Sequence, residues 1–251
     1  VPGHILERIA KSWIKNSNTV YHECVCSSET HPFLYNVRGF RLDLIHWINP
    51  LVYQVYGSTI LVPQVAMIHH ATDEELPAMI KKLKYCDGIT TVSYRWKSKL
   101  ELLVDREVIL IPNTVDSRKF IPSNNQTILR RQHNISINSF VLGFVGKSAA
   151  NAFGRKGINI LLEVLRESAQ IWKDLSLLLI GPGWDDLTKQ ITTMGIKVYR
   201  YEVKTTEDTA SLYPLMDALL VTSSQEGGPC TILEAMACGV PVITSDVGHV
   251  P

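Results

Sequence analysis

Two glutamates near the end of the sequence flank a Gly-Gly-Pro turn and the start of an expected helix. In order, the stretch contains Glu226, Gly227, Gly228, Pro229, Cys230, Thr231, Ile232, Leu233 and Glu234. A proline suits the first turn of a helix, because the N–H that it lacks would have no helical partner there. The N–H groups of the three residues after the proline then point out of the helix. Together with the helix dipole, they favour a phosphate group.

The two carboxylates of this stretch take different positions. Glu226 falls in the loop before the expected helix, and Glu234 falls in its second turn. The pair can therefore flank one bound nucleotide sugar, with one carboxylate at each end. The structural alternative is that a glutamate near a helix start only stabilises the helix dipole.

A basic, glycine-containing loop forms a second group. It follows the expected strand Phe140–Val145 and contains Gly146, Lys147, Gly154, Arg155, Lys156 and Gly157. Glycines allow a close approach of the backbone to a ligand, and the basic side chains supply positive charge for a diphosphate. A solvated loop with turn glycines is the alternative interpretation. The spacing fits neither a Walker A loop nor a Gly-x-Gly-x-x-Gly dinucleotide site.

Both groups come directly after short apolar runs that are typical of buried parallel strands. Such runs are expected at Val20–Cys26, Leu42–His46, Val65–Ile68, Gly88–Val92, Val108–Ile111, Phe140–Val145, Leu175–Ile180, Lys197–Tyr201, Ala218–Thr222 and Val240–Ile243. Helical patterns are expected at Ile5–Ile14, Arg95–Val104, Ile158–Ala169, Tyr213–Met216 and Cys230–Ala237. The alternation predicts an α/β fold with parallel sheets, in which ligands bind beyond the carboxyl ends of the strands.

The pattern divides into two Rossmann-like domains. We expect an N-terminal domain over residues 1–123, a polar linker over 124–138 and a C-terminal domain over 139–251. The chain begins with Val1 rather than Met and ends at Pro251. We therefore expect that both ends are cut.

Composition excludes several classes of protein. Of the 251 residues, 45% are hydrophobic and 20% are charged, and the formal net charge is +1, which argues against a nucleic-acid partner. Five scattered cysteines do not form a disulfide framework and favour a reduced, cytoplasmic compartment. The sequence has no apolar run of about 18 residues, the length that a membrane-spanning helix requires.

The stretch from Glu226 to Ile243 closely resembles the E-x7-E region of retaining GT-B glycosyltransferases of the family 4, or group 1, type. Gly146-Lys147 and Lys156-Gly157 are similar to the family's Gly-Arg and Lys-Gly positions, with lysine in place of the usual arginine at 147. Met67-Ile68-His69 resembles the strand end whose histidine lies near the donor sugar. His70 stands where the family often has aspartate, and Gly3 falls in what resembles its glycine-rich acceptor loop.

The resemblance implies two Rossmann-like domains with a donor and acceptor cleft between them. It further implies that the first domain lacks its first strand in this sequence and that the second is incomplete at its end. It also implies transfer of a sugar from a nucleoside diphosphate sugar to a saccharide, lipid or other hydroxyl acceptor, with retention of anomeric configuration. In that scheme Glu226 and His69 are catalytic, Glu226 contacts the sugar hydroxyls, and Glu234 contacts the ribose. The donor-binding set implied by the resemblance is Gly146, Lys147, Lys156, Gly227, Gly228, Pro229, Cys230, Thr231, Ile232 and Glu234. Gly3 and His70 belong to the acceptor side, and no metal or other cofactor is expected.

Two other functions remain open at this point. One is another GT-B chemistry, such as a sugar-nucleotide epimerase. The other is a non-catalytic relic or assembly subunit that keeps the nucleotide site. Basic residues in 95–99, with Arg8, Lys11 and Lys15, could touch anionic lipid at a membrane surface, or could form a solvated helix face.

Overall fold

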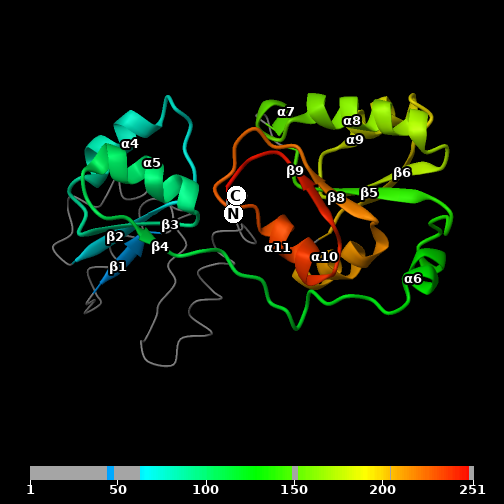
Figure 1. Ribbon diagram of the computed structural model, residues 1–251, viewed down its shortest axis with the longest axis horizontal. Helices are drawn as coiled ribbons and strands as arrows, with labels where there is room; N and C mark the ends of the chain where they lie inside the picture. Colours follow the sequence, from blue (N-terminus) through cyan, green and yellow to red (C-terminus); the bar gives the residue numbers. More distant parts are fainter. Residues whose placement is uncertain (1–43, 48–62, 149–151, 204, 249–251) are drawn as a thin grey trace. The chain divides into compact units, whose positions relative to one another are not determined.

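The computed structural model describes residues 44–47, 63–148, 152–203 and 205–248. The chain divides into two compact units, Val1–Asn113 and Thr114–Pro251. The expected helix Ile5–Ile14, the expected strand Val20–Cys26 and Gly3 lie outside the described residues. Within them, the α/β architecture with parallel sheets is confirmed (Figure 1).

The described part of unit 1 is a parallel sheet in the order β1-β2-β3-β4. Its strands are β1 (Ile45–Trp47), β2 (Gln64–Ile68), β3 (Gly88–Thr91) and β4 (Ile109–Leu110), and its helices are α4 (Leu76–Leu83) and α5 (Tyr94–Val104). Both helices cover one face of the sheet (Figure 1). The buried side chains of Trp96 and Leu100 join Ile68 and Ile89 in one apolar cluster, which holds the helices on that face.

The described part of unit 2 is a parallel sheet in the order β7-β6-β5-β8-β9. Its strands are β5 (Phe140–Val145), β6 (Leu175–Ile180), β7 (Lys197–Tyr201), β8 (Ala218–Val221) and β9 (Val242–Thr244). Its helices are α6 (Gln126–Gln132), α7 (Ala152–Arg155), α8 (Ile158–Ile171), α9 (Asp185–Thr192), α10 (Thr206–Leu212), the 3-10 helix η2 (Tyr213–Leu215) and α11 (Cys230–Ala237).

Alternate residues of the central strands face opposite sides of this sheet, as the two-residue period of a strand requires. Leu142 and Phe144 of β5 belong to the cluster formed with α8 and α9, whereas Val141 belongs to the cluster formed with η2 and α11. Helices therefore cover both faces of the sheet, with α8 and α9 on one side and α10 and α11 on the other (Figure 1). Every residue of β6 is buried, which explains why all of them except Ser176 are apolar.

The strand order reverses between β5 and β8. The chain runs outward from β5 through β6 to β7, then crosses back so that β8 pairs with the other edge of β5. In open parallel sheets, ligands bind beyond the carboxyl ends of the strands at such a reversal. The loops after β5 and β8 are the two that the sequence singled out, so the fold brings them to one place.

The boundary between the units differs from the expected one. The division falls after Asn113, and the expected linker, 124–138, contains helix α6 within unit 2. The side chain of Asn125 caps this helix by accepting from the N–H of Ile128 at 3.2 Å. Arg130 is buried, although a polar sequence favours exposure. The segment expected as a linker thus contains a helix that the buried Arg130 holds, while most of its other polar residues are exposed.

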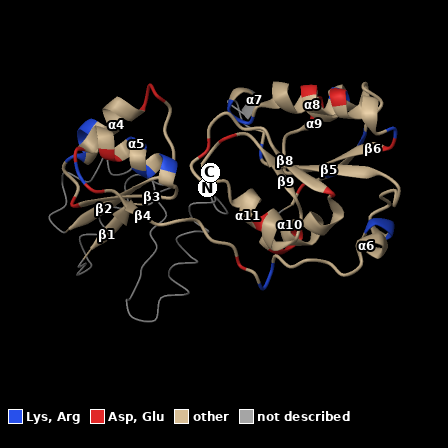
Figure 2. Cartoon of the chain, in the orientation of Figure 1, with Lys and Arg blue, Asp and Glu red and all other residues tan. Residues whose placement is uncertain are grey.

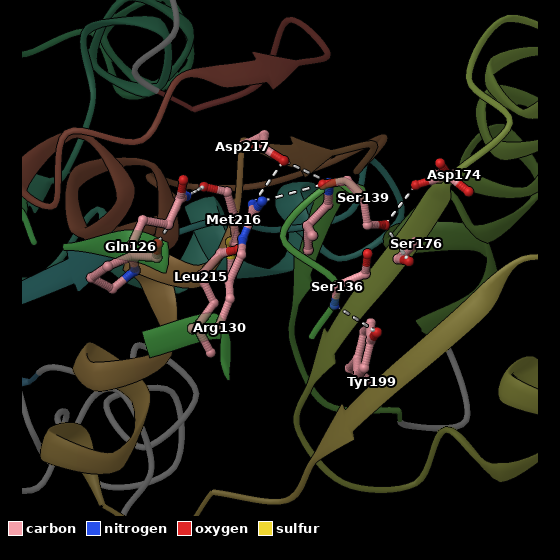
Figure 3. Close-up of polar contacts among 12 residues, drawn as sticks. Gln126, Arg130, Ser136, Ser139, Asp174, Ser176, Tyr199, Leu215, Met216 and Asp217 are labelled. Carbon is pink, nitrogen blue, oxygen red and sulfur yellow. Dashed lines mark hydrogen bonds and ion pairs between the residues drawn. The ribbon is translucent and has the colours of Figure 1, made fainter. Parts of the chain in front are cut away.

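Arg130 fastens α6 to the sheet (Figure 3). Its guanidinium donates to the carbonyl oxygen of Leu215 at 2.9 and 3.1 Å, to that of Ser139 at 3.2 Å and to the carboxylate of Asp217 at 2.8 Å. Asp217 also accepts from the N–H of Val141, the second residue of β5, at 2.7 Å. This network lies at the amino ends of β5 and β8, opposite the edge where the ligand is expected.

Helices α9 and α10 were not predicted. The first turn of α10 carries a capping box, in which Thr205 accepts from the N–H of Asp208 and Asp208 accepts from the N–H of Thr205. That pairing is a recognisable sequence signal for a helix start. In α9 only Leu187 and Ile191 are buried, and that single apolar pair at four-residue spacing is a weaker signal.

Candidate functional site

The carboxylate of Glu226 is the centre of a charged cluster at the carboxyl edge of the unit 2 sheet. Its Oε1 accepts from Nζ of Lys156 at 2.7 Å, from Nη1 of Arg155 at 3.0 Å and from Oγ of Ser223 at 3.0 Å. The Glu226 side chain is only 7% exposed. A buried carboxylate is stable when it is paired and hydrogen-bonded, and both conditions are met here. The structure therefore joins the Gly-Gly-Pro loop to the basic loop that precedes α8.

The charge state of Glu226 follows from these contacts. Burial by itself raises the pKa of the Glu226 carboxyl, but the charges and hydrogen bonds of Lys156, Arg155 and Ser223 outweigh it. The net effect holds the pKa of this carboxyl below its ordinary value. Glu226 is thus an anion at neutral pH, and both of its carboxylate oxygens can act as hydrogen-bond acceptors.

Backbone contacts fix the two loops against each other. Oγ1 of Thr222 donates to the carbonyl oxygen of Lys156 at 2.8 Å, and the N–H of Ser224 donates to that of Arg155 at 2.9 Å. Gly157 caps α8 with a φ of 61°, and a Cβ at this position would lie 1.8 Å from the carbonyl oxygen of Thr222. Only glycine fits, both for the left-handed backbone and for the close approach.

The loop after β5 lies against the turn that follows β6. The indole N–H of Trp184 donates to the carbonyl oxygen of Gly146 at 2.9 Å. Gly181 has a φ of 123°, and a Cβ there would lie 1.8 Å from the same oxygen. The side chain of Lys156 also lies close to Gly146. A Cβ added to Gly146 would be 4.0 Å from Nζ of Lys156. The Lys147 side chain is exposed in the same loop.

The start of α11 differs in detail from the expectation. Pro229 is the N-cap residue, with φ of −64° and ψ of 111°, rather than a residue of the first turn. The N–H of Ile232 donates to the carbonyl oxygen of Pro229 at 3.2 Å, so it is not available as predicted. Cys230 and Thr231 are the first two helical residues, and their N–H groups lie at the helix start. Gly227, Gly228 and Pro229 are buried.

Glu234 lies in the second turn of α11, as predicted, and is 6% exposed. Its Oε2 accepts from the hydroxyl of Tyr213 at 2.7 Å. Tyr213 belongs to η2 and is fully buried. Sequence reasoning identified neither Tyr213 nor Ser223 as part of the site, because each meets its glutamate through the fold. The signal available for Ser223 was its position, since a hydroxyl side chain three residues before Glu226 can reach that carboxylate.

The predicted histidines lie in unit 1 at the carboxyl end of β2. Nδ1 of His69 and Nδ1 of His70 are 2.9 Å apart, and their rings meet edge to face at 5.2 Å. In this contact one Nδ1 carries a proton and donates, and the other accepts. Both side chains are half-buried.

Basic residues gather on α4 and α5 in unit 1 and on α6 in unit 2 (Figure 2). Two of those on α5 have partners within the unit. Lys97 pairs with Glu101 at 3.1 Å, and Lys99 pairs with Asp73 at 2.7 Å and lies over the Trp96 ring. Membrane contact through this helix stays a prediction.

Two further results come from the described residues. Among them, no helix is long and apolar enough to cross a membrane. In the same ranges, no three His, Cys, Asp or Glu side chains are grouped so that they could hold a metal ion.

Comparison with known proteins identifies relatives along most of the chain. A family model described as glycosyl transferases group 1 matches residues 139–251. The chain is 33% identical over 238 residues to a GDP-mannose-dependent alpha-mannosyltransferase of Mycolicibacterium smegmatis, covering 84% of this chain and 58% of that protein. It is 26% identical over 228 residues to the Escherichia coli O-antigen biosynthesis glycosyltransferase WclY, covering 83% of this chain and 60% of that protein. The chain spans about half the length of the curated relatives it matches.

The structure resembles a solved glycosyltransferase fold. Superposition on the crystal structure of Anabaena HepE in complex with UDP and glucose gives a TM-score of 0.70. The sequence identity is 20%, and the match covers 86% of this chain and 63% of that one. At this identity the likeness shows a shared fold. Residues 139–251 are thus a glycosyl transferases group 1 domain, and the chain shares the GT-B fold of these enzymes.

Proposed function

We propose that this protein transfers a sugar from a nucleoside diphosphate sugar to a hydroxyl acceptor, with retention of anomeric configuration. The observation that carries the proposal is the contact between Lys156 and Glu226 at the strand reversal between β5 and β8. A cation for the diphosphate and an anion for sugar hydroxyls stand side by side, where open parallel sheets bind ligands. Relatives named as glycosyltransferases support the same activity.

In the proposed reaction, the bond between the anomeric carbon and the diphosphate oxygen breaks, and its electron pair stays on the departing diphosphate. The acceptor oxygen bonds to the anomeric carbon, and its proton passes to the oxygen of the departing diphosphate. The site must therefore stabilise a developing negative charge, which is commonly the largest contribution to catalysis. An ammonium group has three donors, so Lys156 can keep its bond to Glu226 and also donate to phosphate. The N–H groups at the start of α11 act in the same direction.

The remaining predicted residues have defined places in this proposal. Lys147 adds an exposed positive charge beside the diphosphate, Glu234 takes the ribose hydroxyls, and His69 is a second catalytic residue. No metal is required in this scheme, because lysines and a helix dipole neutralise the phosphates. Peripheral contact with a membrane would suit a lipid acceptor and remains part of the proposal.

A turnover assay tests the proposal. A panel of UDP-, GDP- and ADP-sugars is incubated with the full chain and simple hydroxyl acceptors, and release of nucleoside diphosphate is followed together with the anomeric proton of the product. We expect acceptor-dependent release from one donor and a product of unchanged configuration. Glu226→Gln should abolish release, whereas Glu167→Gln, at an exposed position of α8, should not. An inverted product would refute retention, and nucleotide binding without release would favour the non-catalytic subunit.

A further inference from the structure

A hydrogen bond joins the buried side chains of Tyr213 and Glu234. The proposed reaction gives a role to Glu234 but none to Tyr213. The Tyr213 hydroxyl lies 2.7 Å from Oε2 of Glu234. Burial first, and then the negative charge of Glu234, raise the pKa of the Tyr213 phenol well above its ordinary value. The phenol therefore keeps its proton and donates a hydrogen bond to the Glu234 carboxylate. Bonds of this charge-assisted kind are roughly twice as strong as neutral ones.

The tyrosine is held rigidly, which lets it impose an orientation on its partner. Its ring is fully buried and meets the Phe120 ring edge to face, with 5.7 Å between centroids. A glutamate side chain has three rotatable bonds and loses conformational freedom when it is fixed. A fixed donor of this kind restricts the glutamate before a ligand arrives. The entropy cost of ordering that side chain is therefore not added to the free energy of binding.

Helix α6 is hydrogen-bonded to the backbone that carries Tyr213. Nε2 of Gln126 donates to the carbonyl oxygen of Pro214 at 3.0 Å, and Nη2 of Arg130 donates to that of Leu215 at 2.9 Å. Both acceptors belong to η2, the short helix that carries Tyr213. The polar network at the amino edge of the sheet thus fixes the backbone of Tyr213, whose hydroxyl donates to Glu234.

We infer that Tyr213 is a positioning residue, which holds the Glu234 carboxylate in the orientation that receives the ribose hydroxyls of a nucleoside diphosphate. The inference rests on the proposed function, in which Glu234 contacts the ribose. A carboxylate offers about four acceptor sites on two oxygens, so it can bond Tyr213 and a ribose at once. Tyr213 itself touches no substrate in this account.

Calorimetric titration of the full chain tests the inference, with UDP, GDP and ADP compared with their 2′,3′-dideoxy counterparts. For the nucleotide that binds, we expect wild type to lose about tenfold in affinity when the ribose hydroxyls are removed, which is the worth of one charge-assisted bond. Tyr213→Phe should weaken binding of the ribonucleotide about tenfold and leave binding of the dideoxynucleotide nearly unchanged. On a Glu234→Ala background, Tyr213→Phe should have no further effect on ribose discrimination.

The control is Tyr199→Phe, which removes a hydroxyl from another buried tyrosine of unit 2. That hydroxyl accepts from the N–H of Ser136 at 3.3 Å and lies outside the proposed donor site. Equal weakening of both nucleotides by Tyr213→Phe, or no weakening of either, would overturn the positioning role alone. Wild type that binds no diphosphate, or binds ribo and dideoxy forms equally, would overturn the role assigned to Glu234 and the inference with it. Circular dichroism establishes that each variant is folded.

Discussion

Nζ of Lys156 and Oε1 of Glu226 lie 2.7 Å apart, although seventy residues separate them in the chain. Lys156 precedes α8, and Glu226 follows β8, and the strand reversal beside β5 brings the two together. The contact gives unit 2 a paired cation and anion at the edge where a diphosphate sugar is expected.

Substitution of Gly157 should damage the backbone of the site. A Cβ here would lie 1.8 Å from the Thr222 carbonyl oxygen, and the backbone is left-handed. Gly157→Ala should lower the free energy of unfolding by roughly 2–5 kcal/mol, as the sum of backbone strain and overpacking. The matched control is Gly195→Ala, where φ is 79° and no atom lies within 4 Å of the added Cβ.

For the control, left-handed backbone alone should cost roughly 1–2 kcal/mol. Urea unfolding monitored by tryptophan fluorescence measures both variants. Equal losses of stability would show that the contact with Thr222 does not restrict residue 157.

Removal of the buried guanidinium of Arg130 should destabilise unit 2. Arg130→Met keeps much of the side-chain volume but leaves the Asp217 carboxylate and the Leu215 carbonyl oxygen without this donor. Breaking a buried pair in this way costs about 3–5 kcal/mol. Arg131→Met, on the exposed side of the same helix, should change stability by less than about 0.5 kcal/mol. Thermal melting of the two variants decides the matter, and similar melting temperatures would contradict the assigned role.

Much of unit 2 could be predicted from the sequence. The bounds of β5, β6, β7 and α11 agree with the expected ones. For β5 and β6 the reason is that buried strands give mostly apolar runs, and α11 begins after a proline. Glu226 and Glu234 could also be predicted as site residues, because the loop and the start of the helix that carry them are contiguous in sequence.

The support of the site could not be predicted in this way. Arg130 looked like a solvated linker residue, because its partner Leu215 lies 85 residues away and acts through a backbone carbonyl. Tyr213 was expected only in a short helix, because nothing local shows that its hydroxyl meets Glu234. Such pairings depend on how the strands are ordered, which periodicity does not reveal.

Acid should weaken the Glu226 cluster in a defined direction. The folded pKa of Glu226 is lower than its ordinary value of 4.5, so the unfolded chain takes up the proton first. The stability that the carboxylate contributes is complete above about pH 4.5 and is lost as pH falls through the lower folded value. Melting temperatures of wild type and Glu226→Gln, measured from about pH 7 to pH 3, should therefore converge at low pH. Two curves that stay parallel throughout would count against the ionised pair.

The two histidines of unit 1 should differ in importance. His69→Ala should lower kcat/KM by about tenfold or more, in line with the loss of one catalytic hydrogen bond. The affinity for nucleoside diphosphate should stay unchanged. His70→Ala removes the ring nitrogen 2.9 Å from Nδ1 of His69, and should have a smaller effect on turnover. Steady-state kinetics with the donor found in the turnover assay compares the two. A larger loss for His70→Ala would reverse the assignment.

The central claim is that Lys156 and its partners hold a nucleoside diphosphate at the β5 and β8 edge of unit 2. Calorimetric titration of UDP, GDP and ADP into wild type and Lys156→Ala tests it most directly, with Lys189→Ala, an exposed lysine on α9, as the control. We predict micromolar binding of one diphosphate, weakened about 10- to 100-fold by Lys156→Ala and unchanged by Lys189→Ala. Folded wild-type protein that binds none of the three, or a Lys156→Ala variant that binds as tightly as wild type, would contradict the account.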